Sequence, residues 1–171
     1  SAPTSGGEND LGGYLRICGI NFGLQADFGT ATGARVYINN VEVANYRAHI
    51  PTKCSGRIPI TTLVVQLGSL GGLSTGTAGD VKVVVNGVSS NTNLQFRPSG
   101  GRVIFVSLSG NDATAAVNDI ALPFRHLQNG GSPATADVYK ALAAGDQVVI
   151  RGGTWGDSTG VDNTWMRWSG G

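Results

Sequence analysis

The chain has 171 residues, which is enough for one domain of common size or two small ones. Charged residues make up 13 % of it, about half the usual share of roughly 25 %, and the formal net charge is +1 with no basic run. This balance excludes an electrostatic argument for nucleic-acid binding. No apolar stretch approaches the roughly 20 residues that span a bilayer, so membrane insertion is not expected. Low charge with abundant Gly, Ser, Thr and Asn is typical of extracellular β proteins and predicts a secreted or cell-surface location.

Residues 1–10 are small and polar, and they predict a linker or a frayed terminus. After them, short apolar runs alternate with turn residues. The expected strands are 14–20, 35–38, 41–43, 60–67, 81–85 and 94–96. Asn39-Asn40 and Asn86-Gly87 are typical of tight hairpin turns. Several short strands at this spacing, with no convincing helix, predict a β-sandwich over residues 11–98.

The same region resembles the IPT/TIG family, whose domains have an immunoglobulin-like fold. GGYLRICGINFG is similar to the family's opening strand, and the motif "I-x-G-x-N/T-F-G" falls on Ile17, Gly19, Asn21, Phe22 and Gly23. ARVYINNVEV resembles the next hairpin, and GDVKVVVNGVSSNTNLQF resembles the closing hairpin. The resemblance covers about residues 10–97 and implies an immunoglobulin-like β-sandwich.

A boundary is expected at Arg97-Pro98-Ser99-Gly100-Gly101, because proline and paired glycine end one strand ladder before another begins. Beyond it, Val103–Val106 reads as a strand, and Pro123 is well placed to open a short helical turn. Ser132-Pro133 is the expected start of a longer helix, and Gln147–Arg151 is the expected second strand.

This order of strand, Gly-Asn-Asp loop, "P-F" turn, helix and "A-G-D-x-V-x-I-R-G-G-T" strand resembles the N-terminal cap of pectate-lyase-like right-handed parallel β-helices. The resemblance covers about residues 102–156. It implies that residues 99–171 form a short α/β segment, namely a cap and an incomplete first coil. Because one coil cannot bury its stacking faces alone, we expect this chain to be a piece of a larger protein.

Cys18 and Cys54 are the two cysteines of the chain. A disulfide between them would close a loop of about 36 residues and contribute roughly 3–4 kcal/mol in the chain-entropy model. The alternative is a pair of buried free thiols. Because other features indicate secretion, the sequence favours the disulfide.

Asn111, Asp112 and Asp119 gather in one polar loop. Hard oxygen ligands are what Ca²⁺ requires, and the resemblance to β-helix lyases implies a possible calcium site there. The alternative is that these residues shape the loop through Asx turns. His49 and His126 are the only histidines; no Cys/His spacing indicates zinc, so we expect packed or exposed neutral side chains.

Trp155, Trp165 and Trp168 follow the second expected strand, which ends at Arg151. Flat aromatic faces suit the C–H groups of pyranose rings, so the three tryptophans are candidates for carbohydrate binding. Arg151, which lies close to them in the sequence, is the fourth candidate. The alternative is that the tryptophans pack in the core or between coils.

The two resemblances together imply the non-catalytic N-terminal portion of a secreted carbohydrate-active protein. Its parent is expected to be a polysaccharide lyase or another β-helix polysaccharide-processing protein. The family's catalytic residues occur in later coils, so none is assigned here and the chain itself is not expected to be an enzyme. One alternative is a structural or adhesive extracellular subunit that self-assembles into filaments or oligomers through exposed β edges. Another is a sugar-binding module that uses the tryptophans. The expected partners are a polysaccharide, further copies of the chain, or the missing β-helix coils.

Overall fold

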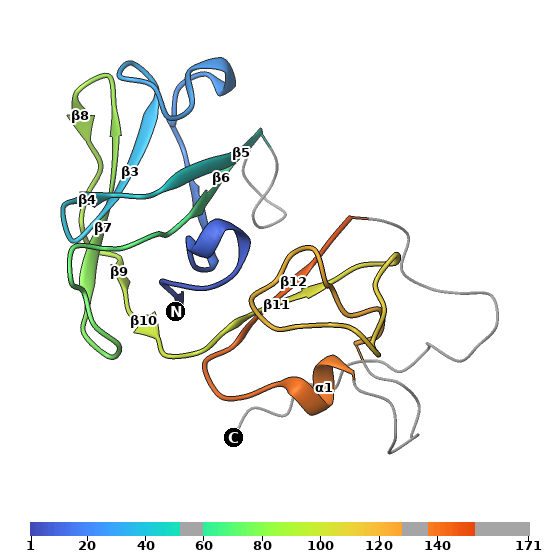
Figure 1. Ribbon diagram of the computed structural model, residues 1–171. Helices are drawn as coiled ribbons and strands as arrows, with labels where there is room; N and C mark the ends of the chain where they lie inside the picture. The colour runs from blue at the N-terminus through green and yellow to red at the C-terminus, as the bar shows by residue number, and fades with distance from the viewer. Residues whose placement is uncertain (52–59, 128–136, 153–171) are drawn as a thin grey trace.

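The computed structural model describes residues 1–51, 60–127 and 137–152, and these residues form a mainly β fold (Figure 1). The strands are β1 (Ala2–Pro3), β2 (Tyr14–Gly19), β3 (Ala34–Ile38), β4 (Val41–Glu42), β5 (Asn45–Pro51), β6 (Thr61–Gln66), β7 (Gly79–Val85), β8 (Val88–Ser89), β9 (Gln95–Phe96), β10 (Pro98–Ser99), β11 (Val103–Val106) and β12 (Gln147–Ile150). The short helical segments are η1 (Glu8–Asp10), η2 (Gln25–Asp27) and α1 (Val138–Ala141). The predicted β-rich class is confirmed. A helix with the length and apolar character to cross a bilayer does not occur in the described part of the chain.

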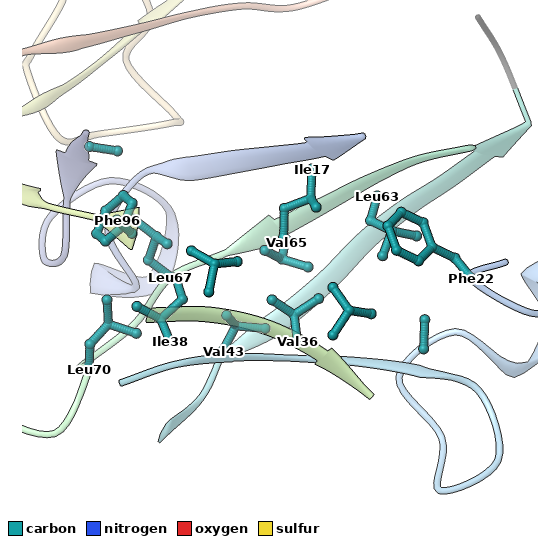
Figure 2. Close-up of a cluster of buried hydrophobic side chains, with 14 residues drawn as sticks. Ile17, Phe22, Val36, Ile38, Val43, Leu63, Val65, Leu67, Leu70 and Phe96 are labelled. Atoms are coloured by element: carbon teal, nitrogen blue, oxygen red, sulfur yellow. The ribbon is translucent and has the colours of Figure 1, made fainter. Parts of the chain in front are cut away.

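Two antiparallel sheets face each other in the first part of the chain, in a sandwich-like arrangement. One has the strand order β2-β6-β5, and the other has the order β4-β3-β7-β8, with β9 also paired to β7. Successive side chains of a strand point to opposite faces, and in β3 and in the first part of β7 every second residue is buried. Figure 2 shows Val36 of β3 on one side of the core and Ile17 and Val65 of the other sheet on the opposite side. The hydrophobic core of this part lies between the two sheets.

The two predicted hairpin turns are confirmed. Asn39 and Asn40 have φ values of 52° and 61° and connect β3 to β4. Asn86 and Gly87 have φ values of 47° and 79° and connect β7 to β8. Positive φ at both central residues is the requirement of a type I′ turn, and asparagine and glycine meet it at low cost.

A β-bulge interrupts the pairing of β5 with β6. The register shifts after Tyr46, which makes Arg47 the extra residue. Tyr46 and His49 therefore both turn inward, although they are three positions apart, and their rings lie 4.9 Å and 5.6 Å from that of Phe28. The side chain of Arg47 points to the outer face of the sheet, where it pairs with Glu8.

β11 and β12 form a separate parallel pair whose register runs from Val103 opposite Gln147 to Val106 opposite Ile150. Phe124 bridges the other edge of β11 in the same parallel sense. A parallel pair needs a long crossover connection, and here about 40 residues separate the two strands. Every residue of β11 is buried, and its inward side chains form a second small core with Phe124.

The single described α-helical turn, α1, covers the second core with Val138. Its N-cap is Asp137, whose carboxylate accepts a hydrogen bond from the Lys140 amide at 2.9 Å. The predicted helix start at Ser132-Pro133 lies outside the described residues. The predicted helical turn after Pro123 is wrong, because Phe124 instead extends alongside β11 and takes part in a β-bridge.

The structure differs from the sequence prediction of a linker at residues 1–10. We call residues 1–13 the N-terminal arm. In it, β1 pairs in parallel with β10, and Ala2 is only 3 % exposed. Gly12 adopts a φ of 71°, and its amide donates to the Gly6 carbonyl at 2.8 Å, which folds the arm back on itself. Small residues allow this close packing. The N-terminal arm therefore has the composition of a linker but forms an ordered part of the fold.

Candidate functional site

A groove of about 470 Å³ lies between the outer face of the β2-β6-β5 sheet and the β11–β12 pair. This volume falls within the roughly 300–1,000 Å³ of ordinary ligand sites. Its described polar lining residues are Glu8, Tyr14, Arg47, Gln147 and Arg151, and the rest of its described lining is apolar and comes mainly from β6, β11 and β12. The groove therefore combines a few placed polar groups with an apolar surface, which is the usual composition of a binding site.

The wall of the groove on the sheet side is built around Arg47. The β-bulge directs its guanidinium toward the Glu8 carboxylate, with which it forms an ion pair. Another hydrogen bond runs from Arg47 to Gln66 Oε1 at 2.7 Å. The guanidinium also lies 5.8 Å from the centroid of the Tyr14 ring. Arg47 is therefore held in one position, and its charge is partly balanced by Glu8.

Tyr14 is a fixed hydrogen-bond donor beside Arg47. Its hydroxyl donates to Glu8 Oε2 at 2.8 Å. Burial, followed by this hydrogen bond to Glu8, raises the pKa of Tyr14 to about 12. The Arg47 and Arg151 charges act in the opposite direction on that pKa, which places both guanidinium groups in the electrostatic environment of the phenol. At neutral pH the phenol stays protonated.

Gln147, the first residue of β12, connects the two walls. Its Oε1 accepts a hydrogen bond from the Tyr14 amide at 2.7 Å, and its Nε2 donates to the Tyr14 carbonyl, also at 2.7 Å. The side-chain amide thus pairs with the β2 backbone as a neighbouring strand would. Because Oε1 and Nε2 of Gln147 both bond the Tyr14 backbone, this side chain sets the distance between the two walls of the groove.

Arg151 follows β12 on the other wall, and its backbone amide donates to the Val106 carbonyl at 2.9 Å. The sequence predicted this residue as part of a carbohydrate site, and the structure places it in the groove. Among the described lining residues, two arginines (Arg47 and Arg151, +2) face one glutamate (Glu8, −1), which leaves a formal charge of +1. An anionic ligand would complement this groove.

Two of the three predicted calcium ligands shape their own loops. Asn111 Oδ1 accepts a hydrogen bond from the Ala113 amide at 3.0 Å, and Asp119 Oδ1 accepts one from the Ala121 amide at 2.8 Å. These are Asx turns, the alternative that the sequence left open.

The third predicted ligand, Asp112, is buried beneath the segment that follows Phe124. One carboxylate oxygen accepts hydrogen bonds from the Arg125 and His126 amides at 2.8 Å and 3.1 Å, and the other contacts the His126 ring. Burial raises the pKa of Asp112, but the His126 ring and the two backbone amides outweigh it and hold that pKa below its usual value. Within the described ranges, no three His, Cys, Asp or Glu side chains come together as a metal site. Calcium stays a prediction that these contacts do not support.

Cys18 is disulfide-bonded, while Cys54 lies outside the described residues, so the pairing of the two stays a prediction. Trp155, Trp165 and Trp168 also lie outside the described residues.

Sequence reasoning missed four of the five polar groove residues, which are Glu8, Tyr14, Arg47 and Gln147. The bulge at Arg47 could not be predicted, because the inward orientation of Tyr46 and His49 that accompanies it is seen only in the structure. Nothing in the sequence indicated that Glu8 belongs to a site, since its neighbours have the composition of a linker.

Comparison with family models, with curated proteins and with solved structures finds no match to this chain. The chemistry of the groove itself therefore carries the functional interpretation.

Proposed function

We propose that this chain is the non-catalytic N-terminal portion of a secreted, β-helix polysaccharide-processing protein, and that the groove holds a stretch of acidic polysaccharide. The observation that carries the proposal is the groove, whose described lining brings the Arg47 and Arg151 side chains together beside an apolar surface. A guanidinium binds a carboxylate with paired, charge-assisted hydrogen bonds. The apolar lining suits the C–H faces of the sugar rings. The Gln147 side chain is not counted among the sugar-binding groups, because both of its amide atoms bond the Tyr14 backbone.

The architecture of the second part supports a β-helix parent. β11, β12 and the Phe124 bridge run in the same direction, as successive strands of a parallel β-helix do. Val138 of α1 covers the small core beneath β11, and terminal caps of this kind protect the end of a repeat array. For the first part we propose an IPT/TIG domain, supported by two facing antiparallel sheets and by type I′ turns at Asn39-Asn40 and Asn86-Gly87 within the family-like segments.

The groove chemistry favours binding over catalysis. A general base works best with a pKa near the operating pH. The Tyr14 phenol, with a pKa of about 12, stays protonated. The Glu8 carboxylate is occupied by Arg47 and by Tyr14. Among the described groove residues, no side chain is placed to remove a proton from a sugar at neutral pH.

Affinity electrophoresis tests the proposal directly. The protein is run through gels that contain polygalacturonate, alginate or neutral dextran, and each mixture is assayed for unsaturated uronate at 235 nm. We expect retardation only by the acidic polymers and no absorbance change. Retardation by dextran alone, migration unaffected by every polymer, or turnover at 235 nm would each refute the proposal.

A structural or adhesive role is the second candidate, and the outer edge of β12 favours it. Among the described strands, β12 pairs only with β11, and Ile150 at its end is 45 % exposed. An uncovered strand edge recruits further strands. Sedimentation velocity at rising concentration decides this case: concentration-dependent assemblies support it, and a monomer at the highest concentration excludes it.

A further inference from the structure

The N-terminal arm lies between the two halves of the molecule. Figure 1 shows the N-terminus between the sandwich and the β11–β12 pair. β1 pairs with β10, the segment that leads from the sandwich into β11, with Ala2 opposite Pro98. The Gly13 amide donates to the Pro3 carbonyl at 2.7 Å, so the end of the arm returns to its beginning. The arm is therefore a closed, hydrogen-bonded loop at the junction.

On the sandwich side, the arm is held by Gln66, a fully buried glutamine in the central strand β6. Its Nε2 donates to the Glu8 carbonyl at 2.9 Å and to the Gly12 carbonyl at 3.3 Å. The Leu67 amide adds a bond to the Gly13 carbonyl at 3.1 Å. A buried glutamine is costly unless its amide is hydrogen-bonded, so these contacts fix the arm on the sheet.

On the other side, the arm contacts the segment around β11. Asn118 pairs with β11 through its side chain and its backbone, accepting from the Val103 amide at 2.8 Å and donating to the Val103 carbonyl at 2.7 Å. A Cβ at Gly6 would collide with the Asn118 side chain, and one at Gly7 would lie 3.1 Å from Val103. Only glycine permits the arm to approach β11 this closely.

In the second glycine pair, Gly13 does the same at the groove and Gly12 within the arm itself. A Cβ at Gly13 would collide with Gln147 Oε1, the atom that accepts from the Tyr14 amide. A Cβ at Gly12 would lie 2.6 Å from the Pro3 carbonyl oxygen. Gly6, Gly7 and Gly13 are thus the places where the arm lies against its neighbours with no room for a side chain, and at Gly12 the arm lies equally closely against itself.

We infer that the N-terminal arm, together with Gln147, joins the sandwich and the β11–β12 pair into one rigid body that unfolds as a unit. Without these contacts, residues 97–102 would connect two domains that move independently, which is the default for a small interface. With them, the sheet and the parallel pair keep one orientation, and the groove keeps one width. This inference holds whatever the groove binds.

The test uses Gln147→Leu, which removes both bonds to the Tyr14 backbone while keeping a side chain of similar size. The matched control is Gln95→Leu, at an exposed position in β9, a strand that pairs with β7 of the other sheet. Amide hydrogen exchange of Tyr14 is the direct readout. We expect exchange about tenfold faster or more in Gln147→Leu, as loss of one or two net hydrogen bonds predicts, and about the wild-type rate in Gln95→Leu.

Calorimetry of the unaltered protein gives an independent readout. One body predicts a single transition whose calorimetric and van't Hoff enthalpies agree, and Gln147→Leu is expected to split or broaden it. Two separate transitions in the wild type would overturn the inference. So would a Tyr14 amide that exchanges equally fast in the wild type and in Gln147→Leu.

Discussion

His49 offers an unusual prediction, because replacing it is expected to stabilise the protein. The β-bulge turns this side chain inward, where it is 6 % exposed and packs edge-on against the Phe28 ring. Among the residues that the structure describes, neither Nδ1 nor Nε2 has a hydrogen-bond partner. Leucine at this position removes both polar atoms and keeps an apolar side chain of comparable size.

The magnitude follows from the cost of an unsatisfied buried polar group, which is about 1–3 kcal/mol. A poorer fit of leucine against the Phe28 ring offsets part of the gain, since shape changes in a core cost up to about 1.5 kcal/mol. We therefore expect His49→Leu to raise the free energy of unfolding by about 1 kcal/mol. For a chain of this size, that corresponds to an increase of about 2–4 °C in Tm.

Urea unfolding followed by circular dichroism measures the effect, and an unchanged m-value shows that the comparison is valid. The matched control is Tyr46→Phe, the other inward residue beside the bulge. Its hydroxyl accepts from the Val36 amide at 3.1 Å and donates to Glu42 at 2.6 Å, so its loss is expected to cost about 1–2 kcal/mol. A loss of stability greater than about 1 kcal/mol in His49→Leu would refute the reasoning, because it would mean that the imidazole makes a favourable polar interaction.

Three further predictions concern single positions. Gly12→Ala is expected to cost about 2 kcal/mol or more in urea unfolding, because the position combines a φ of 71° with a Cβ 2.6 Å from the Pro3 oxygen; an unchanged midpoint would contradict the packing of the arm. The pKa of Asp112 is lowered on folding, so its contribution is present above the ordinary carboxyl pKa of about 3.9 and is lost as the pH falls through the lower folded value. The slope of stability against pH below about pH 4 should therefore be smaller in Asp112→Asn, and identical slopes would argue against this assignment. Cys18→Ser is expected to lower the free energy of unfolding by about 3–4 kcal/mol under non-reducing conditions, whereas equal stability would show that the disulfide of Cys18 contributes nothing.

The features predicted correctly from the sequence are the ones that local chemistry decides. Asn39-Asn40 and Asn86-Gly87 specify type I′ turns within two residues, whatever surrounds them. Short apolar runs between turn residues predict strands at Val103–Val106 and Gln147–Arg151, and the structure has them at Val103–Val106 and Gln147–Ile150. β11 and β12 pair in parallel. This pairing agrees with the order of strand, long connection and strand along the chain.

The groove could not be predicted in the same way, because its residues meet through long-range contacts. Glu8 reaches Arg47 only because the N-terminal arm folds over the sheet and because a bulge turns Arg47 outward. Neither event leaves a periodic pattern in the sequence. Composition was misleading at the arm, since small polar residues are common to linkers and to closely packed loops. Asn111 and Asp119 show the same ambiguity, because the side chains that bind calcium are also the ones that form Asx turns.

Calorimetric titration with a galacturonate oligosaccharide is the most direct measurement of whether the groove binds an acidic polysaccharide. The variant is Arg151→Gln, which removes one groove charge, and the control is Lys82→Gln, which removes a half-buried charge from β7 in the opposite sheet. We expect Kd to rise about tenfold in Arg151→Gln, as loss of a hydrogen bond to a charged group implies, and Lys82→Gln to bind like the wild type. Equal affinity in all three proteins, or no binding by any of them, would contradict this expectation.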